Sequence, residues 1–300
     1  MRILVTGACG KLGRAVRQAG AREHTFVLLD VVEAVEAEGG LRGSVADRET
    51  VKRAAEGCDA IIHTAAMHGL FKGKATNQQF LETNVIGAEN LFEAALLHGI
   101  KRIVLSSTLE VIIGEQCDAY GTAIIDEDTP PRPDWIYPVT KLQAEILGSY
   151  YAREHGLEVV SLRYGNILPW TVEKMAFELL ARGLHTDEYA RANLLAVTVP
   201  GLTDHVFHCA AETPLRRPDI LAAMKNPWPV LDRYWPGSSE TLQSHGLTPA
   251  PKYFFPVTRI DKARQILGWR PQITFADYLR LLGWNGLPAF SVGEARNLTQ

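Results

Sequence analysis

The chain has 300 residues, 46% hydrophobic and 22% charged, which is enough for one large α/β domain with a smaller appendage. Its formal net charge of −3, without a basic run, argues against a nucleic-acid-binding surface. No apolar stretch approaches a membrane span, and no signal peptide precedes the first strand-like segment, so we expect a cytoplasmic protein. The four cysteines lack metal-type spacing, so we expect no metal site; Cys58 and Cys209 should be buried free thiols.

The first thirty residues form one unit. Residues 2–6 are an apolar, β-branched run typical of a buried strand, and residues 7–13 are rich in glycine. A helix is expected over 14–19, followed by a strand over 25–29 that ends in Asp30. The order of strand, glycine turn, helix, strand and acid is that of a dinucleotide-binding unit.

Each glycine of the turn has a physical role in holding a dinucleotide. Gly7 allows the tight turn, Gly10 lets backbone N–H groups approach a pyrophosphate, and Gly13 lets the helix pack on the sheet. The carboxylate of Asp30 is placed to accept from an adenosine ribose and would repel the extra phosphate of NADP, which favours NAD. The alternative is that Gly10 and Gly13 only permit close packing.

The remaining elements alternate up to residue 163. An acidic loop or short helix is expected over 31–40, strands over 41–47, 60–66, 103–105 and 158–163, helices over 48–56, 78–98 and 138–154, and a loop over 114–136. This alternation requires a parallel sheet with helices on both faces, whose strand ends converge on one ligand-binding edge. Beyond residue 163 we expect helices over 171–182, 203–212, 261–267 and 275–282, an unassigned segment over 188–195, and a loop over 226–256.

A tyrosine and a lysine four residues apart form the candidate catalytic pair. Tyr137 and Lys141 share one face of the expected helix, and Pro138 suits its first turn. A tyrosine has a pKa of about 10, and the Lys141 cation together with an oxidised nicotinamide is expected to lower it. An exposed i,i+4 pair is the alternative. Thr108, which ends the preceding strand, can hydrogen-bond a substrate oxygen.

The glycine turn, Thr108, Tyr137 and Lys141, in this order, resemble the extended short-chain dehydrogenase/reductase superfamily, and specifically its NAD-dependent epimerase/dehydratase family. Five motifs carry the resemblance along most of the chain, at residues 6–13, 61–66, 84–87, 162–166 and 261–271. Together they are highly specific for the superfamily and much less so for one reaction.

The resemblance implies a Rossmann-type doubly wound parallel sheet. Residues 1–165 would form the NAD-binding domain, whose core continues into parts of the C-terminal half, and residues 166–300 would mainly bind substrate. Tyr137 would be the general base or acid, Thr108 would orient the substrate oxygen, and Lys141 would bind the nicotinamide ribose. The implied cofactor-binding residues are Gly7, Cys9, Gly10, Lys11, Leu12, Gly13, Asp30, Asp47, Arg48, Thr64, Ala65, Ala66, Asn84, Tyr137 and Lys141. Relatives pair the helices at 78–98 and 138–154 across a two-fold axis, which implies a homodimer.

Several of these residues have a structural alternative. Asp47 could simply cap the helix that begins at Arg48. Asn84 is expected to stabilise helix geometry or a water near the active site rather than contact substrate. His63 lies within an apolar strand and is expected to be a core histidine, which leaves His68 as the candidate for touching substrate.

The substrate residues are less well defined. They are Thr108 together with His68, Glu110, Asn166 and Arg191. Glu110 follows Thr108 by two residues, where the family's dehydratases place a glutamate base, but Leu109 stands between them and we favour a solvated loop acid. Between residues 166 and 204 the clear basic residues are Lys174, Arg182 and Arg191, which weakens the case for a nucleotide sugar.

The sequence therefore predicts an NAD-dependent oxidoreductase acting on a secondary alcohol or ketone of a sugar-like small molecule. One alternative is a sugar-nucleotide epimerase or dehydratase that retains its NAD. Another is a non-catalytic NAD-sensing module, against which the presence of Thr108, Tyr137 and Lys141 argues.

Overall fold

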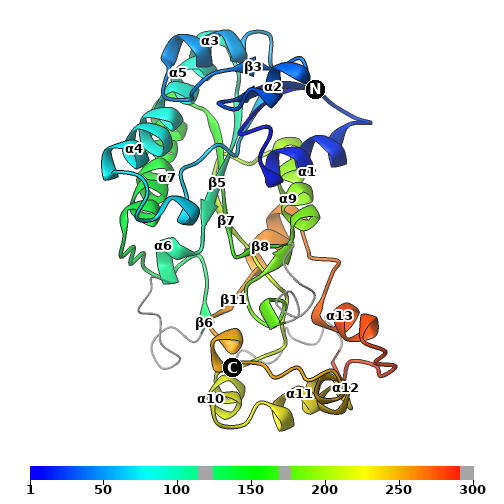
Figure 1. Cartoon of the computed structure of the whole chain (residues 1–300). Coiled ribbons are helices and arrows are strands. Elements are labelled where there is room, and N and C mark those ends of the chain that lie inside the picture. Colours follow the sequence, from blue (N-terminus) through cyan, green and yellow to red (C-terminus); the bar gives the residue numbers. More distant parts are fainter. Residues whose placement is uncertain (114–123, 169–176, 291–300) are drawn as a thin grey trace.

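A parallel sheet of seven strands forms the centre of the computed structural model, which describes residues 1–113, 124–168 and 177–290 (Figure 1). All neighbouring strands in it are parallel, and the order reverses at β1, where β2 lies on one side and β4 on the other. Ligands bind at such a switch point in doubly wound folds. From one edge to the other, the strands are β10 (Asp204–Cys209), β7 (Glu158–Tyr164), β5 (Arg102–Thr108), β4 (Ala60–His63), β1 (Arg2–Thr6), β2 (Thr25–Asp30) and β3 (Leu41–Arg42).

Helices cover both faces of this sheet, as the alternation predicted. On one face lie α1 (Lys11–Gly20) and α9 (Thr186–Thr198), and on the other lie α3 (Arg48–Ala55), α5 (Gly87–His98) and α7 (Ile136–His155) (Figure 1). The side chains of β1 alternate between the two cores, because Ile3 and Val5 enter one and Leu4 enters the other. Strands buried on both faces are apolar throughout, which is why they were recognisable in the sequence.

The long helix predicted over 78–98 is one continuous rod with an irregular turn in it. It comprises α4 (Asn77–Leu81), a π-helical turn (Glu82–Ile86) and α5. Asn84 is buried within the π turn. Turns of this kind are frequent at functional sites, and this one faces the helix that carries Tyr137.

Three parts of the prediction need correction. The helix expected over 203–212 is wrong, since β10 occupies this stretch and pairs with β7, from Asp204 opposite Val159 to Cys209 opposite Tyr164. The loop expected over 226–256 contains α11 (Trp228–Tyr234), α12 (Ser238–Ser244) and a 3₁₀ turn (Pro251–Phe254). Of the strand expected over 41–47, only Leu41–Arg42 forms a strand.

The remaining elements complete the C-terminal half and the loops. The prediction of a helix over 275–282 is confirmed by α13 (Phe275–Leu281), and the helix predicted over 261–267 is present and includes a π turn (Ala263–Leu267). Residues 171–176 and 114–123 lie outside the described residues. The additional elements are α2 (Ala34–Ala37), a 3₁₀ turn (Gly69–Phe71), α6 (Glu110–Ile113), β6 (Ile124–Ile125) paired with β11 (Val257–Thr258), β8 (Ile167–Leu168) paired with β9 (Leu184–His185), and α10 (Arg217–Lys225). None of the helices in the described ranges is both long and apolar enough to cross a membrane.

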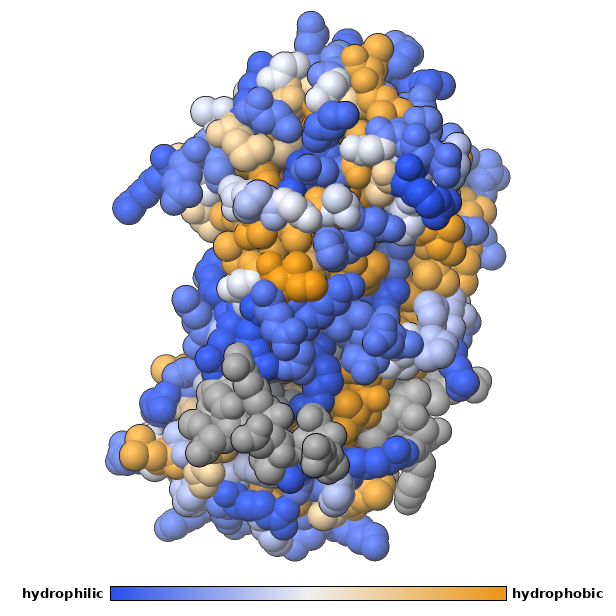
Figure 2. All heavy atoms as spheres, turned by 180° about the vertical axis from the view of Figure 1, so that it is seen from behind, coloured by the Kyte–Doolittle hydropathy of each residue, from blue (hydrophilic) through white to orange (hydrophobic). Residues whose placement is uncertain are grey.

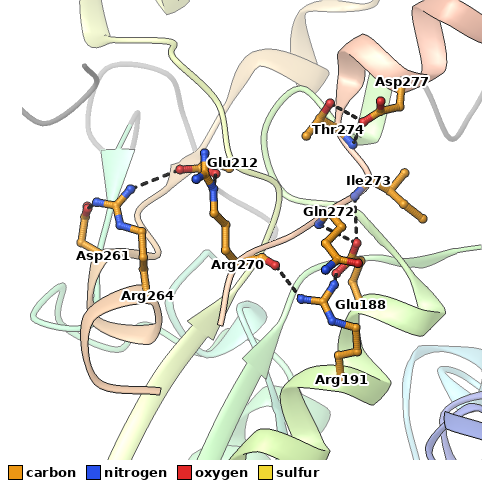
Figure 3. Close-up of polar contacts among 10 residues, drawn as sticks. All are labelled: Glu188, Arg191, Glu212, Asp261, Arg264, Arg270, Gln272, Ile273, Thr274 and Asp277. Atoms are coloured by element: carbon orange, nitrogen blue, oxygen red, sulfur yellow. Dashed lines mark hydrogen bonds and ion pairs between the residues drawn. The ribbon is translucent and has the colours of Figure 1, made fainter. Parts of the chain in front are cut away.

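A buried carboxylate fastens the C-terminal segment to the sheet layer (Figure 3). Glu188 on α9 is 2% exposed and accepts from the backbone N–H groups of Gln272 at 2.7 Å and Ile273 at 2.8 Å. Its other oxygen pairs with Arg191 at 2.6 Å, and Arg191 also donates to the Arg270 carbonyl at 2.8 Å. Close by, Glu212 pairs with both Arg264 and Arg270.

We expect Glu188→Gln to destabilise the fold without changing nucleotide affinity. The amide cannot pair with Arg191, which leaves a partly buried cation uncompensated, at a cost of about 2–4 kcal/mol in unfolding free energy. Asp187→Asn is the matched control, because the neighbouring Asp187 side chain is 72% exposed and should cost less than about 0.5 kcal/mol. Thermal unfolding measures both variants, and equal melting temperatures would contradict the assignment.

Candidate active site

Two positions of the glycine turn, Gly7 and Gly13, have no room for a side chain, as the motif predicted. Gly7 has φ +67°, and a Cβ on it would lie 2.6 Å from the backbone nitrogen of Ala65. A Cβ on Gly13 would lie 2.4 Å from the Gly7 carbonyl oxygen. Gly10 is the N-cap of α1 and supplies no side-chain cap, so the first N–H groups of the helix remain available to an anion. The turn, which also contains Cys9, Lys11 and Leu12, therefore fits a pyrophosphate.

Asp30 lies at the end of β2, directly against the turn. The N–H of Cys9 donates to its Oδ2 at 2.9 Å, and the N–H of Val32 donates to Oδ1 at 3.3 Å. Asp47 caps α3, which is the structural alternative given for it above. It accepts from the N–H groups of Glu49 at 3.0 Å and Thr50 at 3.2 Å. A role for Asp47 toward adenine stays a prediction.

Arg48, Thr64 and Ala66 were also predicted to reach the cofactor. Arg48 lies at the start of α3 and pairs at 3.3 Å with Glu93 on α5. The Thr64 hydroxyl donates at 2.7 Å to the Thr6 carbonyl, which fixes the segment after β4 beside β1. Ala65 and Ala66 follow in this segment and are half-buried at the switch point of the sheet.

Asn84 joins this segment to the helix that carries the candidate catalytic pair. Its side chain accepts from the Met67 N–H at 2.8 Å and donates to the Met67 carbonyl at 2.9 Å. It also donates at 2.8 Å to the hydroxyl of Thr140, which in turn donates to the Tyr137 carbonyl. These contacts support the structural role expected for Asn84, and its contact with the cofactor stays a prediction.

Two histidines near β4 differ in environment. His63 is buried, its Nδ1 lies 2.7 Å from the Thr6 hydroxyl, and burial lowers its pKa to about 3, so it is the neutral core histidine that was predicted. His68 packs against Phe71 with ring centroids 5.7 Å apart. His68 is exposed as a residue, but partial desolvation of its ring lowers its pKa, and so do the Lys141 and Lys11 cations. Its contact with substrate stays a prediction.

Thr108, Tyr137 and Lys141 meet at the carboxyl edge of the sheet. Burial raises the pKa of the Tyr137 phenol, and the Glu110 carboxylate raises it further, whereas the nearby Thr108 hydroxyl lowers it. The protein groups therefore do not produce the lowering expected for this pKa, and the positive charge of a bound oxidised nicotinamide would have to supply it. Lys141 is 3% exposed, and burial lowers its pKa to about 8.

A cavity of about 340 Å³ opens beside Thr108. Two predicted substrate residues besides Thr108 line it, namely Glu110 and Asn166, whereas Arg191 does not, because its guanidinium is held by Glu188 and Arg270. The lining residues are Lys72, Thr108, Leu109, Glu110, Ile113, Trp135, Tyr164, Gly165, Asn166 and Arg182.

The prediction that Glu110 is a solvated loop acid is wrong. It begins α6, is half-buried, and accepts a hydrogen bond of 2.9 Å from the Trp135 indole. Burial raises its pKa, and the Arg182 and Lys72 cations pull in the opposite direction. No sequence pattern indicated that Trp135 and Lys72 would reach this cavity.

Asn166 and Arg182 share one acidic partner. The Asn166 amide donates to Glu178 at 2.9 Å, and Arg182 pairs with the same carboxylate at 3.7 Å. Lys174, the other basic residue noted in this region, lies outside the described residues. Across the ranges that the structure describes, no three His, Cys, Asp or Glu side chains gather as a metal site, and Cys58 and Cys209 are buried free thiols as predicted.

The sheet order and the glycine turn define a dinucleotide-binding protein of the doubly wound class. Comparison with known families gives the finer assignment. Residues 3–188 match the model of the NAD dependent epimerase/dehydratase family. The chain belongs to this NAD-dependent enzyme family, which confirms the predicted family, fold class, cofactor and enzymatic nature.

Relatives within the family act on different molecules. Uronate dehydrogenase from Pseudomonas syringae pv. tomato is 31% identical over 216 residues, which are 69% of this chain and 73% of the relative. L-arabinose 1-dehydrogenase (NAD(P)(+)) from Haloferax volcanii is 32% identical over 261 residues, 83% of this chain and 96% of the relative. The solved glucuronic acid dehydrogenase from Chromohalobacter salexigens is 26% identical with a TM-score of 0.68, over 95% of this chain and 89% of that one.

Proposed function

We propose that this chain is an NAD-dependent dehydrogenase that oxidises a hydroxyl of a free, sugar-like molecule and releases NADH. The observation that carries the proposal is the proximity of Tyr137 to Thr108, which lines a cavity of about 340 Å³. This volume is at the small end of ligand pockets, which favours a single sugar ring over a nucleotide sugar. The uronate and arabinose dehydrogenases among the relatives act on sugars of that size by their names.

In this reaction the phenol of Tyr137 moves the proton. Thr108 orients the substrate oxygen, and Tyr137 as phenolate takes the proton of the reacting hydroxyl. Lys141 would bind the ribose of the cofactor. Bound NAD would supply the hydride acceptor, and its positive nicotinamide would favour the phenolate. Lys141 is buried, so its charge acts in a medium of low dielectric constant, where electrostatic interactions are stronger than in water.

The charges around the cavity favour a sugar acid among such substrates. Among the residues that the structure describes, Lys72 and Arg182 line the cavity together with one carboxylate, Glu110. Arg182 has an ion pair of 3.7 Å with Glu178, which is long enough for the guanidinium to bind a second carboxylate. The named uronate dehydrogenases support the same substrate class.

A substrate screen tests the proposal through the absorbance of reduced nicotinamide. With NAD present, we expect net NADH from hexuronates or free aldoses and none from UDP- or dTDP-sugars. Absence of NADH with every free sugar, together with a converted nucleotide sugar, would overturn the proposal.

That outcome would favour the second candidate, a dehydratase or epimerase that retains its NAD. The specific observation behind it is Glu110, a half-buried carboxylate with a raised pKa beside the cavity, which could remove a proton next to a carbonyl. Product analysis by NMR distinguishes the two, because a dehydratase product contains a new keto group and no net NADH accumulates.

The proposal includes a cytoplasmic homodimer formed through α5 and α7. These helices expose large apolar side chains, with Leu97 62%, Ile146 60% and Tyr150 45% exposed. Figure 2, turned by half a rotation, shows apolar side chains at mid-height along the edge on which α7 lies. Free thiols at Cys9, Cys58 and Cys209 suit a reducing compartment. Sedimentation as a monomer at micromolar concentration would contradict the dimer.

A further inference from the structure

A buried ion pair joins α7 to the sheet one turn beyond Lys141. Glu145 follows Lys141 by four residues, so both side chains lie on one face of the helix. The Arg163 guanidinium on β7 donates to the Glu145 carboxylate twice, from Nε at 3.0 Å and from Nη2 at 2.7 Å. The Ser107 hydroxyl on β5 donates to the same carboxylate. With both charged side chains 6% exposed, the carboxylate links α7 to two strands away from water.

This link lies at the catalytic end of both strands. Ser107 directly precedes Thr108 and stands opposite Arg163 in the register of β5 and β7. The two-pronged Arg163 contact fixes the orientation of the carboxylate as well as its position. A shift of α7 along the sheet would break this contact and would separate the hydroxyls of Tyr137 and Thr108 at the same time.

We infer that Glu145 is a positioning residue of the reaction, an inference that rests on the proposed chemistry of Tyr137, Lys141 and Thr108. Its carboxylate holds α7 in register with β5, so that the phenol meets Thr108, and its negative charge keeps Lys141 protonated. Glu145 acts through these residues. A misplacement of about 1 Å is enough to cost a reaction roughly a hundredfold in rate.

The charge of Glu145 predicts the direction of a pH effect. Burial lowers the pKa of Lys141 to about 8, and the Glu145 carboxylate opposes this decrease. Without the carboxylate the pKa of Lys141 falls further. Activity that requires the ammonium is lost as the pH rises through this pKa, so the alkaline limb of the pH–rate profile moves to lower pH.

The other titratable groups near Lys141 do not account for the alkaline limb of the pH–rate profile, which we assign to Lys141. Burial lowers the pKa of His63 to about 3 and lowers that of His68, so both are neutral above pH 7. Burial raises the pKa of Glu110, and it raises that of Tyr137 above its ordinary value. Both groups lie outside the Glu145 contact, so replacing Glu145 is expected to move the pKa of Lys141 and not theirs. The Arg163 guanidinium stays charged throughout.

The test is Glu145→Gln in the full chain, assayed with the substrate found in the screen. We expect kcat to fall by about tenfold or more and the alkaline limb to move down by about half a pH unit or more, with NAD affinity retained. Because an unpaired Arg163 can prevent folding, the double variant Glu145→Gln/Arg163→Met removes both charges and should show the same two effects.

The control is Glu158→Gln at the opposite end of the same two strands. It breaks the Arg102–Glu158 pair, whose shortest contact is 2.9 Å, and should lower the melting temperature while leaving kcat and the pH profile unchanged. If the Glu145 variants only lose stability, with kcat and the alkaline limb unmoved, the inference is overturned. An active Tyr137→Phe enzyme would instead defeat the proposed chemistry itself, so the two failures are distinguishable.

Discussion

Replacing Tyr137 with phenylalanine should reduce kcat by about 10²–10⁴-fold, because the variant keeps the ring but has no group that can move the proton. The phenol lies near Thr108, the residue proposed to orient the substrate oxygen. Binding of NAD should weaken by no more than about fivefold, since one hydroxyl contact is worth about 1 kcal/mol. Steady-state NADH formation and calorimetric titration with NAD measure the two quantities.

Tyr150→Phe is the matched control for this variant. Tyr150 lies on the same helix but is 45% exposed, so loss of its hydroxyl should leave kcat unchanged. Retention of near-native turnover by Tyr137→Phe would remove the phenol from the mechanism. Equal loss of activity in both variants would indicate damage to α7 instead of lost chemistry.

Replacing Gly13 with alanine should abolish measurable NAD binding, with a loss of affinity of about a hundredfold or more. The new Cβ would lie 2.4 Å from the Gly7 carbonyl oxygen and 2.9 Å from the Ala8 Cα. Both are backbone atoms, so α1 must move away from the turn. Its N–H groups would then no longer point at a pyrophosphate. Overpacking of this kind also costs about 1–3 kcal/mol of unfolding free energy.

Gly69→Ala controls for the added methyl group. A Cβ on Gly69 meets no atom within 4 Å, so stability and NAD affinity should both stay near those of the parent protein. Titration of NAD against intrinsic fluorescence compares the two variants. Normal NAD affinity in Gly13→Ala would mean that the turn is not the pyrophosphate site.

The N-terminal half of the fold could be predicted because two independent signals agree there. β1 and β4 have apolar centres, over residues 3–5 and 60–62, since both faces are buried there, and glycines mark the turn that follows β1. The C-terminal half lacks this agreement. β10 pairs only with β7 at the edge of the sheet, and its pattern of exposed and buried residues does not distinguish a strand from a helix.

The site residues divide in the same way: those marked by a sequence motif could be predicted, and the others could not. Gly7, Asp30 and Thr108 lie at the carboxyl ends of β1, β2 and β5, and Tyr137 and Lys141 lie on α7, as the sequence predicted; their contacts with cofactor and substrate stay predictions. Glu110 was misjudged because its partner, the Trp135 indole, lies 25 residues further along the chain. Arg191 was assigned to substrate for its charge alone, and its partner Arg270 is 79 residues away. Contacts across such separations leave no local pattern.

The hydrogen bonds between α9 and the C-terminal segment determine which fragments of the chain can fold on their own. The Glu188 carboxylate obtains two of its donors from residues 272 and 273, so a fragment that contains α9 but stops short of them would leave one carboxylate oxygen buried without these hydrogen bonds, with Arg191 as the remaining partner. β10 likewise comes after residue 200, and its loss would leave β7 as an open edge. A fragment of the first 165 residues lacks both α9 and β10, so it should be insoluble when expressed alone, and the two halves of the whole chain should unfold in a single calorimetric transition.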